Sequence, residues 1–333
     1  MTKGNAALMK NINLNKLRQV LKEIRSATKP QLAAMTGLSV VTINSLIRIL
    51  VNRGEVLETE ILLSNGGRPA ASFQYNGTYQ LALLIYMVEK SGKDTACVRI
   101  VNLFHEVIDQ IDLVMEDIVL TSFDPLIEKM LSIYPAVKVI GFGLPGVEVD
   151  GKLFLCDYKH LKEQKFSTYI RTRYGLPVII ENDINTAVAG YCYSRKITDT
   201  ACIIGIYFPD KYPPGAGIFL RGQIYKGCNG FAGEVKYLPF SINWDHFDYH
   251  DGCSMQDMML KTIRSFHCMY NPNEMILYGT AVTEELINAI KESCVTDIEK
   301  MMMPRITRSD ELIRHFEIGL CELTLSLLEP IIN

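Results

Sequence analysis

Two short polar motifs hold the side chains of this sequence that are best placed to bind a ligand. Asn182-Asp183 follows the apolar run Val178–Glu181, and Glu234 closes the glycine-rich segment Gly227–Glu234. The end of a buried strand, just before a helix, is where ligand-binding groups collect in α/β folds. Each motif also has a structural interpretation, because Asn182 or Asp183 can cap the following helix and the glycine-rich segment can be a tight turn. The residues alone leave both interpretations open.

A third motif, Gly141–Gly146, matches the pattern GxGxxG of nucleotide-binding proteins. A dinucleotide site needs a helix that starts inside the motif and places its N-terminus on the pyrophosphate. Here Pro145 and the following Val147–Gly151 predict a loop and then a hairpin. We therefore reject a nicotinamide-dependent enzyme.

The elements that must position these motifs alternate between strands and helices from about residue 78 onward. Three consecutive strands of an antiparallel meander come first. The expected strands are Leu81–Val88, Thr95–Asn102, Glu106–Asp112, Val137–Phe142, Val178–Glu181 and Ala201–Tyr207, and the expected helices are Pro125–Tyr134 and Ile184–Tyr193. This order predicts an α/β core, divided into two lobes.

Composition limits the class of protein. The chain has 333 residues, of which 48% are hydrophobic and 21% are charged, the balance of a soluble protein with two or three packed domains. Disorder and a coiled-coil rod are excluded. No apolar run approaches the ~20 residues that span a bilayer, and the first four residues contain no apolar signal core. We expect a cytoplasmic protein with no membrane partner.

The nine cysteines stand singly along the chain, without a CxxC pair. A disulfide scaffold and a ready-made zinc site are therefore not expected. We predict that these cysteines are buried thiols in a reducing compartment.

Charge is distributed unevenly along the chain. Residues 1–75 contain ten Lys or Arg and four Glu, a net charge of +6, whereas the remainder carries −9. A basic segment on an acidic body indicates contact with a polyanion such as nucleic acid. Many solvated helices are basic too, so charge alone leaves the function open.

The basic segment begins with two predicted helices. The first covers roughly residues 13–26, because apolar residues recur there at helical spacing: Leu14, Leu17, Val20, Leu21 and Ile24. Thr28 and Lys29-Pro30 open the second helix, with proline at a tolerated first-turn position. The apolar residues of this short helix are Leu32, Ala33 and Met35.

A third predicted helix, Val40–Asn52, follows the turn Thr36–Ser39, in which Ser39 is the helix cap. Its buried face consists of Ile43, Leu46, Ile47 and Leu50. That face leaves Val40 and a set of short polar and cationic side chains outward, as a DNA recognition helix requires. We predict DNA contacts from Ser39, Thr42, Asn44, Ser45 and Arg48. The alternative is an ordinary three-helix packing unit.

Two β-prone stretches come next, Glu55–Leu63 and Ala71–Tyr75, with the turn Asn65–Pro69 between them. A hairpin that follows a helix-turn-helix forms a wing. Arg68, at the tip of this hairpin, is placed to enter a minor groove, where narrow A·T-rich tracts focus negative potential. The alternative for Arg68 is a solvated surface charge.

Taken in order, these motifs resemble the ROK family of repressors, uncharacterised frames and sugar kinases. The basic helices with the GGRP tip, the GxGxPG loop, the END strand end and the GxxGxAGE loop carry the resemblance, together with Asn271-Pro272 and Ile276–Gly279. It implies an α/β, two-lobed, actin-like sugar-kinase fold behind an N-terminal winged helix-turn-helix. It also implies that members with a winged helix regulate carbohydrate genes, usually as dimers or tetramers.

The resemblance divides the chain into a DNA-binding domain, residues 1–76, and a sugar-kinase-like effector domain, residues 77–333. Lobe one of the effector domain covers about 77–185 plus the C-terminal helix, and lobe two covers about 186–315. The family's sugar contacts match Asn182, Asp183 and Glu234, and Asp183 also matches the catalytic base of the kinases. Pro145 and Gly146 match the loop that lines the sugar.

The sequence departs from the family where the kinases bind nucleotide. Their first phosphate loop corresponds to Tyr86–Gly92, which has no glycine pair, and the second falls on Lys211–Pro213. Pro213 and Pro214 lack the N–H groups that would bind a phosphate. We therefore expect no kinase activity and no cofactor.

The family's zinc site is also altered. Tyr237 stands at the position of a histidine ligand, and His246-Phe247-Asp248 replaces a Cys-x-Cys pair, so that only Gly252-Cys253 remains. We predict no metal, although His246, Asp248 and Cys253 are all ligand types. Two of the family's sugar contacts correspond to Tyr237 and Met255, so the pocket is expected to accept a different sugar, a sugar phosphate or no ligand.

The sequence thus predicts a transcriptional regulator, most simply a repressor of carbohydrate genes, which is not an enzyme. Its expected partners are a double-stranded DNA operator, a sugar or sugar phosphate effector, and further copies of itself in a dimer or tetramer. The alternatives are an ATP-dependent sugar kinase with an appended DNA-binding domain, or a regulator that has lost its small ligand.

Overall fold

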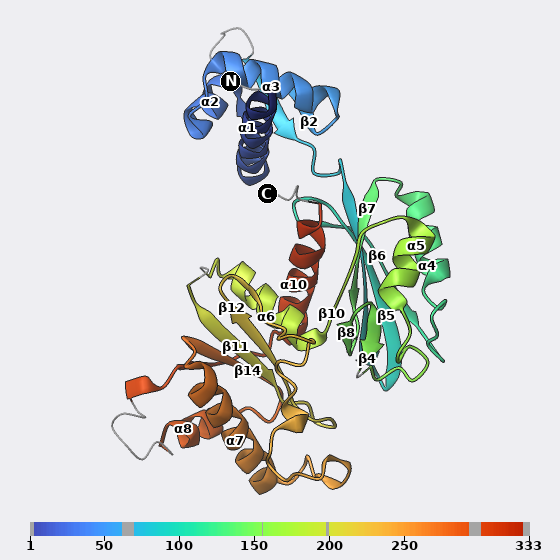
Figure 1. The fold of residues 1–333 in the computed structure, drawn as a ribbon, viewed down its shortest axis with the longest axis vertical. Coiled ribbons are helices and arrows are strands. Elements are labelled where there is room, and N and C mark those ends of the chain that lie inside the picture. The colour runs from blue at the N-terminus through green and yellow to red at the C-terminus, as the bar shows by residue number, and fades with distance from the viewer. Residues whose placement is uncertain (1–2, 62–69, 155, 198–199, 293–300, 329–333) are drawn as a thin grey trace. The chain divides into compact units, whose positions relative to one another are not determined.

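The computed structural model describes residues 3–61, 70–154, 156–197, 200–292 and 301–328. Its contacts divide the chain into two compact units. The first consists of Met1–Leu81, Val101–Ile108 and Tyr134–Val137, and the second of Ala82–Ile100, Asp109–Ile133 and Lys138–Asn333. Figure 1 labels the elements of both units.

The first unit packs three helices against a small antiparallel sheet. The helices are α1 (Lys3–Ile24), α2 (Lys29–Thr36) and α3 (Val40–Asn52), and the strands are β1 (Ser26–Thr28), β2 (Val56–Ile61) and β3 (Ala70–Tyr75), in the order β1-β3-β2. Its buried core contains Leu17, Leu21, Leu32, Ile43, Leu50 and Phe73. The turn predicted at Asn65–Pro69, including Arg68, lies outside the described residues.

Helix α3 has the predicted bounds and the predicted buried face, Ile43, Leu46, Ile47 and Leu50. Gly37 ends α2 in the left-handed conformation, with φ of 67°. The Ser39 side chain then caps α3 by accepting a hydrogen bond from the Thr42 N–H at 3.1 Å. Local chemistry therefore determines both ends of this short connection.

Helix α1 differs from its prediction. It starts at Lys3 rather than at residue 13, because its first half leaves Leu8, Met9 and Ile12 exposed and so has no buried stripe to reveal a period. It also ends earlier, where Arg25 turns the chain with φ of 65° and Ser26–Thr28 pairs with β3. In α2, Met35 is 50% exposed rather than part of the core.

The second unit contains two five-stranded sheets, and the first has the order β10-β7-β4-β5-β6. Its strands are β4 (Leu81–Lys90), β5 (Lys93–Val101), β6 (Val107–Val114), β7 (Val137–Gly143) and β10 (Val178–Glu181). Two helices belong to it, α4 (Asp124–Ile133) and α5 (Phe166–Tyr174), as does the hairpin of β8 (Val147–Val149) and β9 (Lys152–Phe154). We call this set lobe one; the predicted order β4-β5-β6 and the hairpin after Gly146 are both present.

The second sheet has the order β13-β12-β11-β14-β15. Its strands are β11 (Cys202–Tyr207), β12 (Gly215–Leu220), β13 (Gln223–Ile224), β14 (Glu274–Tyr278) and β15 (Arg305–Arg308). The helices α7 (Gly252–Tyr270) and α8 (Glu284–Glu292) and the short 3-10 turns η1 (Val235–Tyr237) and η2 (Trp244–His246) complete the set that we call lobe two. Its core includes Ile204, Met258, Ile263 and Leu277.

Two further helices, α6 (Asp183–Ser194) and α10 (Leu312–Ser326), cross each other (Figure 1). Each contributes a glycine to the crossing, Gly190 and Gly319. A Cβ atom on Gly190 would lie 1.7 Å from the His315 carbonyl oxygen, and one on Gly319 would lie 1.9 Å from the Thr186 carbonyl oxygen. The backbones meet so closely that no larger residue fits at either position. Helix α6 packs on strands β11 and β12 of lobe two, and α10 packs on strand β7 of lobe one. The crossing of the two helices therefore joins the lobes.

The glycines of the GxGxxG motif serve the same packing. A Cβ on Gly141 would lie 1.9 Å from the Thr324 Oγ1, and one on Gly143 would lie 2.2 Å from the Phe316 ring. Both partners lie on α10. These glycines let a helix approach strand β7, and no helix starts within the motif, in agreement with the rejection of a dinucleotide site.

Among the described residues, no single helix is long and apolar enough to cross a membrane. The pair α2 and α3, bent by 110°, reaches the required length and composition only when both helices are counted together. Their apolar residues Leu32, Ile43, Leu46 and Leu50 are buried in the core of the first unit.

The cysteines are less uniformly buried than predicted. All eight within the described residues are free thiols, but Cys228, Cys253 and Cys268 are exposed. Cys294 lies outside the described residues. A single cysteine carries no periodic signal, so its burial depends on tertiary packing that the sequence pattern does not show.

Candidate functional site

The first half of the candidate site lies where β7 and β10 end side by side. The two strands are parallel, and Gly143 pairs with Glu181. The Leu144 N–H then donates to the Glu181 carbonyl at 3.1 Å. This pairing places the loop with Pro145 and Gly146 at the same sheet edge as Asn182, because parallel strands end on the same side.

Asn182 is the N-cap of α6. Its side-chain oxygen accepts a hydrogen bond from the Asn185 N–H at 2.8 Å. Of the two interpretations open from sequence, capping therefore applies to this oxygen, while the amide nitrogen donates to none of the described residues. Asp183 follows as the first residue of the helix, and its Oδ1 accepts from the Ile184 N–H at 2.8 Å.

Glu234 comes to this position from lobe two. The Ala216 N–H, on β12, donates to the Gly233 carbonyl at 3.0 Å, and a Cβ on Gly233 would lie only 1.8 Å from the Ala216 oxygen. The next residue, Gly217, lies against the start of α6, where its Cβ would meet the Ile184 carbonyl at 2.9 Å. Two close glycine contacts thus bring Glu234 toward Asp183.

Three carboxyl groups interact at this place. Burial raises the pKa of Asp183, although its side chain keeps a water-accessible surface. Burial also raises the pKa of Glu234 and of Asp157, and the charge of Asp183 raises both further. Lys236 opposes the shift at both residues. Accessible carboxyls that protein surrounds closely enough to resist ionisation are typical of a ligand-binding or catalytic site.

Asp157 was not predicted. A Cβ on Gly146 would lie 3.1 Å from the Cα of Cys156, so the GxGxPG loop packs directly against the segment that carries Asp157. An isolated aspartate between Cys156 and Tyr158 carries no pattern, and only the folded loop shows that it belongs to the site.

Two contacts join the lobes beside these carboxyls. The Lys226 Nζ lies 2.5 Å from Glu181 Oε2, and Glu181 is almost fully buried at the end of β10. Glu181 also accepts from the Asn185 side-chain amide at 3.2 Å. Four residues after Lys226, Gly230 packs on Val147 of lobe one, where a Cβ would lie 2.5 Å from the valine methyl group. The glycine-rich segment therefore forms a connection between lobes as well as a turn.

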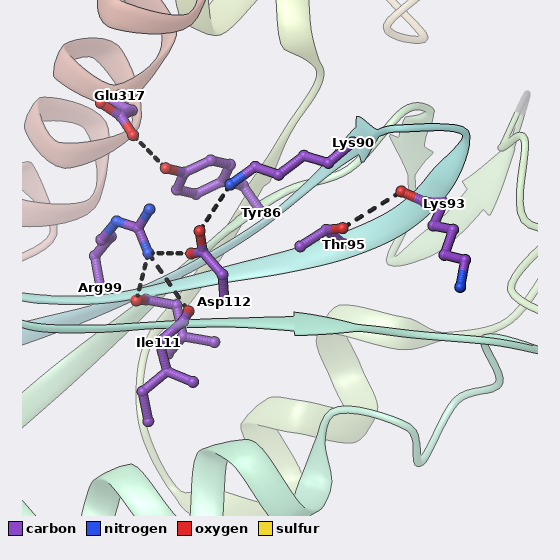
Figure 2. Close-up of polar contacts among 9 residues, drawn as sticks. Tyr86, Lys90, Lys93, Thr95, Arg99, Ile111, Asp112 and Glu317 are labelled. Atoms are coloured by element: carbon purple, nitrogen blue, oxygen red, sulfur yellow. Dashed lines mark hydrogen bonds and ion pairs between the residues drawn. The ribbon is translucent and has the colours of Figure 1, made fainter.

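The region that corresponds to the first phosphate loop of sugar kinases is occupied by a polar cluster of the protein itself (Figure 2). The buried Tyr86 hydroxyl donates to Glu317 on α10, and burial together with that carboxylate raises its pKa. Asp112, on β6, accepts from Lys90 and from Arg99, each at 2.7 Å. These two cations lower the pKa of Asp112 to about 2.

The second phosphate-loop region is bonded to the first. The Lys211 Nζ, in the connection from β11 to β12, lies 2.8 Å from Glu89 at the end of β4. Thr280, after β14, donates to the neighbouring Asp210 at 2.5 Å. Both members of the Lys211–Glu89 pair are exposed, so the ion pair is weak. It nevertheless neutralises one charged group of each loop.

The residues that correspond to the family's zinc ligands do not come together. Within the described part of the chain, no three His, Cys, Asp or Glu side chains are grouped to hold a metal. Tyr237 is 53% exposed. Aromatic contacts stabilise the loop around residues 244–249 instead. The Phe247 ring centroid lies 5.5 Å from that of Trp244 and 4.9 Å from that of Tyr249. The Trp244 indole N–H also donates to the Lys236 carbonyl.

Four of the predicted DNA-contacting residues, Thr42, Asn44, Ser45 and Arg48, lie on α3, and Ser39 is its N-cap. Ser39, Ser45 and Arg48 are exposed, and Thr42 and Asn44 are half-buried. The Asn44 side-chain oxygen accepts a hydrogen bond from Lys29 Nζ at 2.7 Å, which ties α2 to α3. Arg68, the remaining predicted residue, falls outside the described ranges.

Some cations of the basic segment are neutralised within the first unit. Arg18 makes two hydrogen bonds to the buried Glu55 carboxylate, at 2.6 and 2.9 Å. Arg25 pairs with Glu106 at 2.7 Å and lies over the Phe104 ring. The charge available to an outside polyanion is therefore smaller than the sequence count of +6.

A comparison with protein families finds a match over part of the chain. Residues 98–253 match the model of the ROK family. These residues include the Gly141–Gly146 loop, Asn182, Asp183 and Glu234, which carried the resemblance in the sequence.

Several relatives in sequence are named repressors or regulators, and one, from Vibrio cholerae, is named an N-acetyl-D-glucosamine kinase. The xylose repressor of Caldicellulosiruptor bescii is 25% identical over 257 residues, which cover 73% of this chain and 62% of that protein. The chain thus spans less than two thirds of the length of this relative.

Solved structures show the same mixed α/β ROK fold. A ROK family transcriptional regulator, described as a homologue of the Escherichia coli MLC protein, matches 95% of this chain and 98% of its own, with a TM-score of 0.60 and 16% identity. A ROK family glucokinase from Streptomyces griseus, in complex with glucose and AMPPNP, matches 74% of this chain and 99% of its own, with a TM-score of 0.51 and 13% identity. At these identities the likeness concerns the fold, which regulators and sugar kinases share.

Proposed function

We propose that this protein is a sequence-specific DNA-binding repressor whose ROK domain senses a sugar and has no catalytic activity. The observation that carries the proposal is the geometry of α2 and α3. These helices cross at 110° and are joined by the three residues Gly37–Ser39, the arrangement of a helix-turn-helix. The relatives named as repressors support the same function.

The first unit has the further parts that such a reader needs. The outward side of α3 is polar and cationic, as base-edge contact requires. The antiparallel pairing of β2 with β3 supports the assignment of a wing to this unit. We therefore assign residues 1–76 to DNA binding, with Ser39, Thr42, Asn44, Ser45, Arg48 and Arg68 as the contacting residues, and residues 77–333 to a two-lobed, actin-like effector domain.

The sugar is assigned to the carboxyls at the start of α6. Asp183, Glu234 and the Asn182 amide offer acceptors and a donor for vicinal hydroxyls, next to the Pro145-Gly146 loop. A polar group left unpaired on binding costs about 1–3 kcal/mol, and this penalty lets such a site discriminate between sugars. Asp157 and Lys236 add one group of each charge that the family motifs do not include.

The nucleotide of the kinases does not fit this chain. A phosphate cradle needs free backbone N–H groups and cations. Pro213 and Pro214 have no N–H, Lys211 is paired with Glu89, and Lys90 and Arg99 are both held by Asp112. Carboxylates of the protein itself thus pair with the cations that a bound phosphate would need. This pairing argues against phosphoryl transfer.

Sugar binding is coupled to DNA binding through the two lobes. The proposed ligand groups come from both lobes, so a bound sugar favours one arrangement of lobe one against lobe two. An effector shifts the equilibrium between two states only by its difference in affinity for them. In a dimer, the favoured arrangement sets the spacing of the two α3 helices and hence their fit to two half-sites.

Selection of bound duplexes from a random DNA pool, at about physiological salt, tests the reader first. Non-specific phosphate binding is weak under this condition. We expect an inverted repeat with half-sites about one or two helical turns apart. The Arg48→Ala variant should bind more weakly and lose a base preference at one position, whereas failure to enrich any sequence would contradict the proposal.

The selected duplex then serves as the probe for a panel of sugars and sugar phosphates. We expect one class to change the affinity for DNA and to raise the melting temperature. A parallel assay for ADP formation with ATP, Mg²⁺ and the same sugars tests the kinase alternative. Turnover above background would overturn the non-catalytic assignment, and no response to any sugar would favour a regulator without a small ligand.

A further inference from the structure

Val41 is the most exposed large hydrophobic side chain among the described residues. Its relative exposure is 81%, compared with 49% for the adjacent Val40. It occupies the second position of α3, one turn after the Gly37 bend. A valine in full contact with water contributes nothing to the core, so the fold itself does not require an apolar residue here.

Helical spacing places Val41 in line with the polar surface of α3. Asn44, Ser45 and Arg48 follow it at i+3, i+4 and i+7, the positions that share one side of a helix. The buried side, with Ile43, Leu46, Ile47 and Leu50, faces the core instead. Val41 is therefore an apolar side chain at the leading end of a polar and cationic stripe.

The surroundings of Val41 argue for nucleic acid rather than for protein. A protein interface centres on a contiguous apolar patch with few charges. The stripe behind Val41 instead contains hydroxyl, amide and guanidinium groups, within a segment that carries a net charge of +6. In the major groove, the one apolar group on a base edge is the C5-methyl of thymine.

We propose that Val41 recognises a thymine methyl group in the major groove of the operator. This inference rests on the proposed DNA-reading function and names one base that it reads. The position fits, because the N-terminal residues of a recognition helix are those that reach base edges. The Lys29–Asn44 hydrogen bond supports it further, since it fixes the next turn of α3 and leaves Asn44 to offer its amide N–H groups.

The test uses the duplex obtained by selection and replaces each thymine in turn with deoxyuridine, which lacks only the methyl group. Affinity is measured for the full-length protein and for Val41→Ala. For one thymine in each half-site, we expect deoxyuridine to weaken the wild-type protein about fourfold per site, the value of one buried methyl group. Val41→Ala should bind the thymine duplex with a similar loss and show no further loss with deoxyuridine.

Val114→Ala provides the matched control, because it removes a valine of β6 that is 50% exposed and lies outside α3. It should respond to deoxyuridine as the wild-type protein does. Both variants should have the melting temperature of the wild-type protein, since neither side chain is buried. Equal responses of wild type and Val41→Ala at every thymine would overturn the inference while leaving DNA reading intact. If no duplex is enriched at all, the proposed function fails before this question arises.

Discussion

Two regions of the second unit differ in how their charged groups are paired. At the proposed sugar site, which we call the sugar end, Asp183 and Glu234 are accessible to water, and burial raises the pKa of both carboxyls. At the end that corresponds to the phosphate loops of the kinases, the charged groups are paired within the protein. Asp112 pairs with Lys90 and Arg99 (Figure 2), and Glu89 pairs with Lys211. The carboxyls of the sugar end are open to an external ligand, whereas the charged groups of the other end are paired with one another.

This difference separates the groups needed to bind a sugar from those needed to transfer a phosphoryl group. Binding a sugar needs a few oriented hydrogen-bonding groups, but phosphoryl transfer needs an extended array of N–H groups and cations around the nucleotide. Loss of the second array leaves the first intact, because the two are carried by different loops. Under the proposed function, the domain is therefore an effector sensor and not an enzyme.

The largest expected effect comes from breaking the scaffold that both ends share. Gly319→Ala places a methyl group against the Thr186 carbonyl, 1.9 Å away, and should lower the free energy of unfolding by about 1–3 kcal/mol, the usual cost of overpacking. Urea denaturation measures the change. Gly252→Ala is the control, because a Cβ there meets nothing within 4 Å; equal stability of both variants would contradict the close crossing of α6 and α10.

The sugar end is tested by Asp183→Asn. This change keeps the side-chain shape but removes the charge and one acceptor, so the affinity for the effector identified in the panel should fall at least about tenfold. Isothermal calorimetry measures it, and DNA binding of the free protein should remain. Asp150→Asn, at an exposed turn of the β8–β9 hairpin, controls for loss of negative charge. An Asp183→Asn protein with normal effector affinity would remove Asp183 from the site.

The two ends should respond to pH with opposite signs. The pKa of Asp112 is lowered to about 2, first by Lys90 and then by Arg99, so its stabilising contribution is lost as the pH falls from about 4 toward 2. The pKa of Asp183 is raised by burial, so its contribution is lost as the pH rises from about 4 through the raised value. Denaturation midpoints measured across this range check both signs.

Two variants separate these contributions. Asp112→Asn should flatten the loss of stability on the acid side, and Asp183→Asn should flatten the loss that appears as the pH rises. If both variants change the same limb of the profile, the electrostatic contrast between the two ends is wrong.

The smallest expected effect is that of Lys211→Ala. An exposed ion pair contributes at most about 1 kcal/mol, so the melting temperature should hardly change. The variant should also gain no stabilisation from Mg²⁺-ATP, because Pro213 and Pro214 still lack N–H donors. A nucleotide-dependent rise in melting temperature would show that Lys211–Glu89 covers a working phosphate site, and would make the two ends more alike.

The sequence predicted those features that local chemistry determines. Helix α3 was predicted with its bounds because Gly37, Ser39 and four apolar residues at helical spacing specify it without help from other elements. The strand end before Asn182 was predictable for the same reason. The first half of α1 was missed, since Leu8, Met9 and Ile12 are exposed and leave no buried period.

Features that depend on distant contacts were not predictable. Asp157 joins the site only because Gly146 packs on Cys156, and Lys226 reaches Glu181 from 45 positions further along the chain. A lone carboxylate and a lone lysine look like any solvated charge in a sequence. The identification of Asn182, Asp183 and Glu234 as sugar contacts came from family motifs, and it stays a prediction.

The glycine crossing of α6 and α10 has a mechanical consequence. Asp183 is the first residue of α6, and Gly190, about 10 Å further along the axis at 1.5 Å per residue, is held against α10. A rigid rod held at an inner point tilts about that point when its end is pulled. We therefore expect α6 to act as a lever, in which a small movement of Asp183 toward a ligand turns the helix and the strands packed on it, rather than compressing the chain locally.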